Sequence, residues 1–168
     1  MKKTFLLSLL LTLSLTAVAQ KRWDAVTAKE VVNLVLEGGY GFGDVMARNG
    51  YTLVNYVTLS GDSFVTIYRR NCVTDNNGDV LRLGQGVSSV VICSNNTDQP
   101  SEIAVSLFST TNANLFRQQC FDLGFKKSGT VRGNTVYKIP GYEFAIVESK
   151  GKSGRYAVTM FYFTQEYH

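Results

Sequence analysis

The sequence is poor in histidine and has an odd number of cysteines. His168 is the only histidine and the last of the 168 residues, a position where disorder is common. This argues against histidine-based triads, cysteine–histidine pairs and histidine-ligated zinc or iron. The three cysteines, Cys72, Cys93 and Cys120, form no C-x-x-C pair, and at least one thiol cannot pair within the chain. We therefore predict no catalytic residue, no metal ligand and no cofactor.

Charged residues are also scarce, since they make up 18% of the chain, and the net charge is +4. Lys2 and Lys3 supply half of this excess, so a mature chain without them would have a net charge of +2. Nucleic-acid binders usually concentrate positive charge on one face, and this composition gives no sign of such a concentration. We predict an unidentified protein or glycan partner, and no nucleic acid.

Long apolar runs are absent outside the N-terminus. After Lys2 and Lys3, residues 5–17 are apolar apart from Ser and Thr, and Ala17-Val18-Ala19 has the small-x-small pattern of a signal-peptidase site. The run is too short to span a bilayer as a mature helix. We predict a signal peptide at 1–19 and an exported bacterial protein, periplasmic or extracellular, with no integral membrane segment in the mature chain. Because Gln20 stands where a lipoprotein has Cys, no lipid anchor is expected.

The chain contains an internal repeat with a period of about 74 residues. The corresponding positions are Gly50-Tyr51 and Gly124-Phe125, Phe42 and Phe116, and Met46 and Cys120. Each of the two glycines is expected to end a helix directly in front of an aromatic residue. We predict an N-terminal extension at 20–27, repeat 1 at 28–100 and repeat 2 at 101–168.

This layout of an exported, duplicated chain resembles the tandem architecture of the β-lactamase inhibitory protein family. In that family two similar units of helix plus antiparallel strands make one molecule. The layout is also similar to that of uncharacterised secreted domains of bacteria. The resemblance implies an α+β fold in which two similar repeats of a short helix plus antiparallel strands form one mostly antiparallel sheet layer. It rests on no residue motif, so it implies no target and no site residue.

Caps and periodicity predict the elements of each repeat. In repeat 2 we expect a strand at 102–109, a helix capped by Asn112 that runs through Leu123, and strands at 134–139, 142–149 and 155–164. The apolar stripe of that helix is Ala113, Phe116, Cys120 and Leu123. In repeat 1, Thr27 to Glu30 form a capping-box pattern flanked by Val26 and Val31 as a hydrophobic staple. This pattern predicts a helix at 28–37, whereas the repeat favours a strand at 31–36, and we prefer the helix.

A glycine-rich stretch, LEGGYGFGDVMARNGY at 36–51, resembles a phosphate-binding loop. Its glycines at 39, 41 and 43 give G-x-G-x-G rather than the dinucleotide-binding spacing, and no Gly-Lys-Ser/Thr follows. We interpret it as a glycine-rich helix start that places Phe42 and Met46 in the core.

A polar stretch, DNNGD at 75–79, presents oxygen ligands at alternate positions, as calcium requires. An EF-hand would need Gly and Glu where Val80 and Gly86 stand, and Asn77-Gly78 is a strong hairpin signal. We predict a two-residue turn that pairs Asn76 with Asp79 and places Cys72 opposite Leu83. A second turn at 84–86 would pair Leu83 with Val87 and put Cys93 level with residue 77, too far from Cys72 for a disulfide.

Aromatic residues are abundant, with 10 Phe, 9 Tyr and 1 Trp. The last predicted strand is apolar on both faces, which suits either a covered sheet or a recognition surface. Our candidate binding residues are Tyr137, Tyr142 and Tyr156, with Lys150, Lys152 and Arg155 of the cationic turn at 149–155. We predict an exported, non-catalytic recognition module. The alternative is a histidine-free hydrolase of glycans that uses two carboxylates, although Glu143 and Glu148 would project to opposite faces of their strand.

Overall fold

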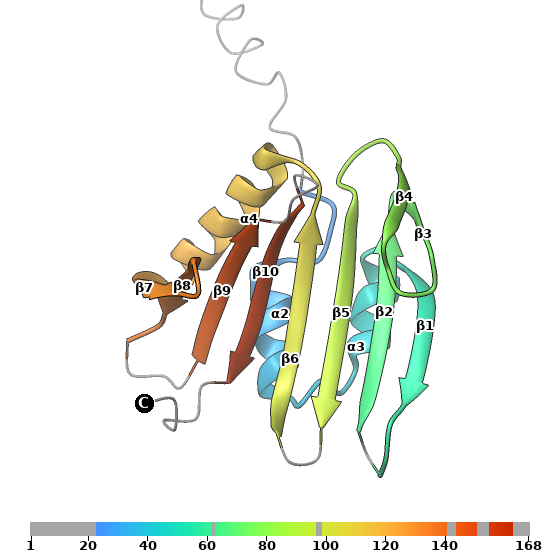
Figure 1. The fold of residues 1–168 in the computed structure, drawn as a ribbon, viewed down its shortest axis with the longest axis horizontal. Coiled ribbons are helices and arrows are strands. Elements are labelled where there is room, and N and C mark those ends of the chain that lie inside the picture. The colour runs from blue at the N-terminus through green and yellow to red at the C-terminus, as the bar shows by residue number, and fades with distance from the viewer. Residues whose placement is uncertain (1–22, 62, 97–98, 141–143, 151–154, 163–168) are drawn as a thin grey trace, which may run out of the picture.

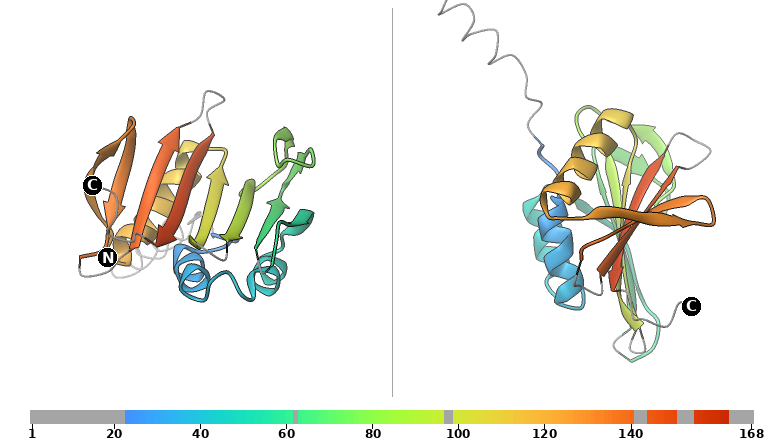
Figure 2. Two further views of the ribbon diagram at one scale, coloured as in Figure 1. Left: turned by 60° about the horizontal axis from the view of Figure 1, so that its bottom comes forward. Right: turned by 90° about the vertical axis from the view of Figure 1, so that its left-hand side faces the viewer.

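The computed structural model describes residues 23–61, 63–96, 99–140, 144–150 and 155–162. Within these ranges the chain is an α+β fold in which the helices lie on one side of a large antiparallel sheet (Figure 1, Figure 2). The helices are α2 (Ala28–Leu36), α3 (Phe42–Arg48) and α4 (Thr110–Asp122). No helix in this described part of the chain is long and apolar enough to cross a membrane.

The main sheet has eight strands, and every neighbouring pair is antiparallel. In order across the sheet they are β1 (Thr52–Thr58), β2 (Phe64–Arg70), β5 (Ser89–Asn96), β6 (Gln99–Leu107), β10 (Tyr156–Tyr162), β9 (Phe144–Lys150), β8 (Asn134–Lys138) and β7 (Lys126–Val131). The α+β class and the antiparallel sheet are therefore confirmed. β1 and β7, the first strands after α3 and α4, form the two edges.

The core lies between the sheet and the helices. Helix α2 packs against β6, β10 and α4, and alternate residues of β6 and β10, such as Val105 and Val158, are buried beneath it. The intervening residues, such as Ala104 and Thr159, lie on the opposite face and are half-buried. We call this opposite side the open face of the sheet.

Helix α2 confirms the helix prediction over the strand alternative. The Thr27 side chain accepts a hydrogen bond from the backbone N–H of Glu30, and the Glu30 carboxylate accepts one from the N–H of Thr27. Both staple residues, Val26 and Val31, are fully buried. These two local contacts satisfy the N–H groups of Thr27 and Glu30 at the start of the helix.

Helix α4 begins earlier than predicted. Ser109, not Asn112, is the N-cap, and its hydroxyl accepts a hydrogen bond from the backbone N–H of Asn112. The Asn112 side chain is instead buried in the first turn. Both residues are good N-caps by type, and the extended backbone of Ser109 at the end of β6 decides between them. Three residues of the predicted stripe, Ala113, Phe116 and Cys120, are buried as expected.

The hairpin at 72–83 confirms one predicted pairing and corrects another. Cys72 lies opposite Leu83, as predicted, in a separate two-stranded sheet of β3 (Cys72–Thr74) and β4 (Val80–Leu83). The Asn76–Asp79 pair is not formed, because Oδ1 of Asp75 accepts the N–H groups of Asn77 and Asp79 and closes a wider loop.

The predicted meander of β4 with the following strand is wrong. β5 leaves the hairpin and enters the middle of the main sheet, where Cys93 lies opposite Thr66 on one side and Ile103 on the other. The reason is burial, since β5 is apolar on both faces and only a central position covers both. All three cysteines fall within the described residues and are free thiols.

The strands predicted in the C-terminal half match the structure within three residues, except for one that was missed. β6, β8, β9 and β10 lie at the predicted places; the predicted ends at 142–143 and 163–164 fall outside the described residues. β7 was not predicted, because its sequence KKSGTV lacks apolar alternation. It becomes a strand by pairing with β8.

Candidate binding cleft

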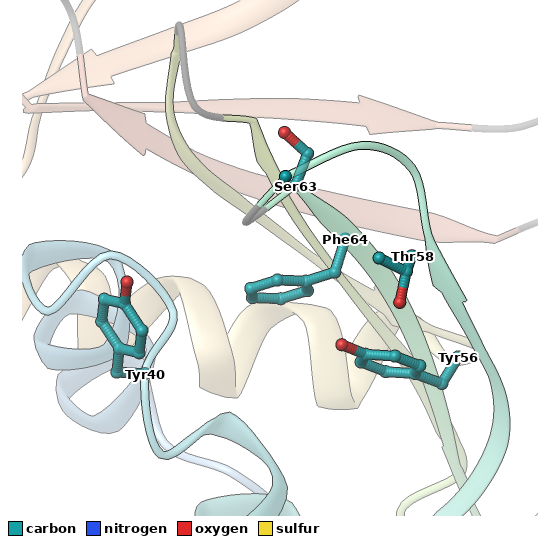
Figure 3. Close-up of a pocket in the computed structure, with 6 residues that line it drawn as sticks. Tyr40, Tyr56, Thr58, Ser63 and Phe64 are labelled. Carbon is teal, nitrogen blue, oxygen red and sulfur yellow. The ribbon is translucent and has the colours of Figure 1, made fainter.

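An open cleft lies on the helix side of the sheet, beside the turn that joins β1 and β2 (Figure 3). Its volume is about 260 Å³. The lining residues are Tyr40, Tyr56, Thr58, Gly61, Ser63 and Phe64. Two separate segments therefore form it: the loop between α2 and α3, and the β1–β2 hairpin.

The glycine-rich loop before α3 supplies Tyr40. Gly38, Gly39 and Gly41 all have left-handed backbones, with φ of 67°, 79° and 74°, which residues with a side chain seldom adopt. Asn95 of β5 donates a hydrogen bond of 3.0 Å to the carbonyl of Gly38 and fixes the loop to the sheet. Tyr40 stands out from the surface of this loop and is 67% exposed.

The β1–β2 hairpin supplies the opposite wall. The rings of Tyr56 and Phe64 stack with centroids 6.2 Å apart and planes 17° apart. Phe64 also packs against the core, whereas Tyr56 is 56% exposed. Figure 3 shows Tyr40 facing these two rings across the gap. A hydrogen bond of 2.9 Å from the N–H of Leu59 to the carbonyl of Ser63 closes the hairpin and keeps this wall in place.

The cleft combines aromatic faces with hydroxyl groups. Tyr40, Tyr56 and Thr58 each contribute a hydroxyl, and Tyr40, Tyr56 and Phe64 contribute rings. An aromatic ring has a negative face that attracts polarised C–H groups, and a hydroxyl can both donate and accept a hydrogen bond. This set of groups suits an uncharged ring that has C–H groups on its faces and hydroxyls on its rim.

None of the sequence-predicted binding residues that the structure describes lines this cleft. Tyr137 and Tyr156 both lie on the helix-covered side. Tyr137 is 8% exposed, packs on the Phe121 ring at 5.5 Å, and donates a hydrogen bond to Glu148. Tyr156 is half-buried and pairs with the hydroxyl of Thr110 at 2.9 Å. Tyr142 lies outside the described residues.

The two cationic candidates within the described residues, Lys150 and Arg155, make different contacts. Lys150 lies over the ring of Tyr156, with Nζ 5.6 Å from the centroid. Arg155 instead reaches the open face, where its Nη2 donates a hydrogen bond of 2.7 Å to the Ser106 hydroxyl. Its Nη1 lies 3.8 Å from Oδ1 of Asp79 in the β3–β4 loop. Lys152 falls outside the described residues.

The carboxylate of Glu148 is held in an ion pair rather than left free. Nε and Nη2 of Arg117 each donate to one of its oxygens, and the Tyr137 hydroxyl donates to Oε2. The bond to Glu148 raises the pKa of Arg117. This network joins α4 to β8 and β9. Glu143, the other carboxylate considered for hydrolysis, is outside the described residues.

The calcium-like loop at 75–79 is a hairpin tip, as predicted. Oδ1 of Asp75 is occupied by two backbone N–H groups at 2.9 Å each. Among the residues that the structure describes, no three Asp, Glu, Cys or His side chains are grouped to hold a metal ion.

Sequence reasoning missed the three aromatic residues of the cleft. The sequence offered one signal for Tyr40, which is its position between Gly39 and Gly41. Glycines have no side chains that could cover the ring, so this position favours an exposed tyrosine. Tyr56 and Phe64 gave no such signal, because their meeting depends on the register of the hairpin. Comparisons of the chain with protein-family models, with curated proteins and with solved structures give no match. The resemblance to the β-lactamase inhibitory protein family stays a prediction.

Proposed function

We propose that this chain is an exported, non-catalytic recognition module that binds a sugar ring of a glycan between Tyr40 and the Tyr56–Phe64 pair. The observation that carries the proposal is the exposure of Tyr40 and Tyr56, at 67% and 56%, on opposite walls of one open cleft. Exposed tyrosines are enriched where proteins recognise partners. A sugar ring offers the C–H faces and the hydroxyl rim that these walls match.

The size of the cleft supports a single ring as the bound unit. Its volume of about 260 Å³ lies just below the range of roughly 300–1,000 Å³ that is usual for complete small-molecule sites. Because the cleft is open, a longer chain can continue beyond the bound ring. Export, which the N-terminal sequence predicts, would place the module where such polymers occur.

We also infer that the chain consists of two related units, residues 28–100 and 101–168. The ends of α3 and α4 support this inference, since Gly50 and Gly124 both have left-handed backbones, with φ of 71° and 96°. In each case the next residue, Tyr51 or Phe125, is buried and its N–H bonds to the carbonyl five residues earlier, at 3.0 and 3.1 Å. The aromatic cleft described above lies at the helix start of the first unit.

Glycan-array binding followed by calorimetry tests the glycan proposal. Tyr56→Ala is expected to weaken binding about tenfold or more, as loss of a central aromatic contact does. Tyr56→Phe keeps the ring and is expected to retain most of the affinity. Phe121→Ala is the matched control, because Phe121 is also an exposed aromatic residue but lies on α4. A blank array, or equal losses in Tyr56→Ala and Phe121→Ala, would refute the proposal.

A further inference from the structure

The two edges of the main sheet are protected differently. Both β1 and β7 are interrupted by a bulge, between Leu53 and Asn55 in β1 and between Lys127 and Gly129 in β7. β7 also has Lys126 and Lys127, and lysine on an edge strand discourages pairing with another chain. β1, with the sequence TLVNYVT, has no charged residue and no proline.

β1 is apolar where a surface edge strand is usually polar. Leu53, Tyr56 and Val57 are 50%, 56% and 42% exposed, and Leu59, just beyond the strand, is 59% exposed. β1 is the outermost strand of the main sheet (Figure 1), and among the described strands only β2 pairs with it. The β3–β4 loop contacts β1 through a side chain, since Asn55 donates a hydrogen bond of 3.3 Å to the carbonyl of Asn76. The outward backbone groups of β1 are therefore a free template for another strand.

We infer that β1 pairs with β1 of a second copy of this chain, antiparallel and around a two-fold axis at Val57. A second copy is a suitable partner because β1 has no charged residue that would repel the same strand of another copy. The bulge ends at Asn55, and from there the register with β2 is continuous, so residues 55–59 form the regular part of the edge. A two-fold axis at Val57 uses this part alone.

The backbone geometry agrees with this register. The N–H of Leu59 bonds to Ser63 across the hairpin, and in an antiparallel ladder alternate residues turn to the same side. Val57 therefore directs its N–H and C=O toward β2, whereas Tyr56 and Thr58 direct theirs outward. With the axis at Val57, Tyr56 of each copy meets Thr58 of the other, and both residues exchange backbone hydrogen bonds.

The side chains agree as well. Tyr56 and Thr58 lie opposite Thr66 and Phe64 of β2, so both side chains are on the helix side of the sheet. In the dimer, Tyr56 of one copy and Thr58 of the other would therefore lie on the same face. The two Val57 side chains meet on the open face, and aliphatic β-branched pairs stabilise neighbouring strands. The pairing places no charged side chain of β1 against its copy.

The dimer would bring two clefts together. Tyr56 and Thr58 line the cleft and also lie at the predicted interface, so the cleft of one copy adjoins that of the other across the axis. Two adjoining sites on one face would engage successive parts of a single polymer and raise the overall affinity. This last consequence rests on the proposed function, whereas the dimer itself does not.

Sedimentation velocity of the full chain, as isolated from expressing cells, tests the dimer without any glycan. At about 100 μM, well above a micromolar Kd, we expect the wild type to sediment as a dimer and Val57→Lys as a monomer. Val131→Lys is the matched control, with the same substitution on the other edge strand at a position that is 59% exposed, and it should stay dimeric. A monomeric wild type, or equal behaviour of the two variants, would overturn the inference.

Disulfide trapping tests the register. Directly opposed residues of an antiparallel pair have Cα atoms about 4.5–5.5 Å apart, within the reach of a disulfide. Val57→Cys, in a Cys72→Ser background that removes the half-exposed native thiol, is expected to form a covalent dimer with oxidised glutathione, and Val131→Cys in the same background is not. A Val57→Cys chain that stays uncrosslinked would contradict the register. If the array is blank while these dimers form, only the glycan proposal fails.

Discussion

The hydroxyl of Tyr137 donates a hydrogen bond of 3.1 Å to Oε2 of Glu148, on the helix-covered side of the sheet. Burial raises the pKa of Tyr137, and the neighbouring Glu148 carboxylate raises it further, so the phenol keeps its proton at neutral pH and acts as the donor. The same carboxylate is bound by Arg117 of α4. Tyr137 therefore helps to hold α4 on the sheet, which makes it a structural residue.

Substitutions of Tyr137 should change stability in proportion to what they remove. Tyr137→Ala deletes a buried ring beside Phe121 and should cost about 3–5 kcal/mol of unfolding free energy. Tyr137→Phe removes only the hydrogen bond to a charged acceptor and should cost about 1–3 kcal/mol. Urea denaturation measures both. Values within about 0.5 kcal/mol of the wild type, as expected for an exposed site, would contradict this assignment.

Loss of Arg117 should also destabilise the protein. Arg117→Ala would leave the carboxylate of Glu148, which is only 14% exposed, without its cationic partner, and we expect a cost of about 1–3 kcal/mol. Arg82→Ala is the control, because Arg82 is an exposed cation on β4, and it should have almost no effect. Equal melting temperatures for the two variants would show that the Arg117–Glu148 pair contributes nothing.

The left-handed glycines should be needed to hold Tyr40 in place. An added Cβ at Gly41 would contact nothing within 4 Å, but φ there is 74°, so Gly41→Ala introduces backbone strain alone, at a cost of about 1–2 kcal/mol. Gly129→Ala is the matched control, since its Cβ would also contact nothing within 4 Å and its φ is not in the left-handed region. Chemical denaturation should separate the two variants, and identical midpoints would argue against strain at Gly41.

Stability should fall in alkali, partly because of Tyr51. Burial raises the pKa of Tyr51 from 10.0 to about 12, against the opposing effect of its hydrogen bond to Ser89. The unfolded phenol thus loses its proton near pH 10 while the folded one keeps it. Below pH 10 this difference has no effect, and between pH 10 and pH 12 it should remove up to about 1.4 kcal/mol per pH unit.

Tyr51→Phe tests this assignment by urea denaturation at pH 8, 10 and 11. The variant lacks the phenol, so its free energy of unfolding should fall less steeply above pH 10 than that of the wild type. Burial also raises the pKa of the Cys93 and Cys120 thiols to about 12, and these two groups lower stability equally in both proteins. Parallel curves for the wild type and the variant would contradict the role of Tyr51.

Local signals predicted the elements well where neighbours in the sequence provide the contacts. The start of α2 follows from Thr27 and Glu30, whose mutual hydrogen bonds join residues only three apart. Burial of Phe42, Met46, Phe116 and Cys120 follows from helical spacing. The Cys72–Leu83 pairing follows from a turn of the right position, even though its loop is wider than expected.

The cleft could not be predicted in the same way. Tyr40 and Phe64 are 24 positions apart, and both line the cleft in a fold where Asn95 of β5 binds the carbonyl of Gly38 in the glycine loop. The face on which Tyr137 and Tyr156 lie depends on strand order, since a strand has two faces and its sequence alone does not say which one the helices cover.

The sequence by itself determined the capping box of α2, the helix faces that enter the core and the glycine positions, because these depend on interactions over a few residues. Only the tertiary structure decided the position of each strand in the sheet, which side of it the helices cover, and which aromatic residues stay exposed. Those outcomes depend on burial between segments far apart in the chain. Tyr56 shows the difference, since its residue type is compatible with burial or exposure, and its place on an edge strand leaves it 56% exposed.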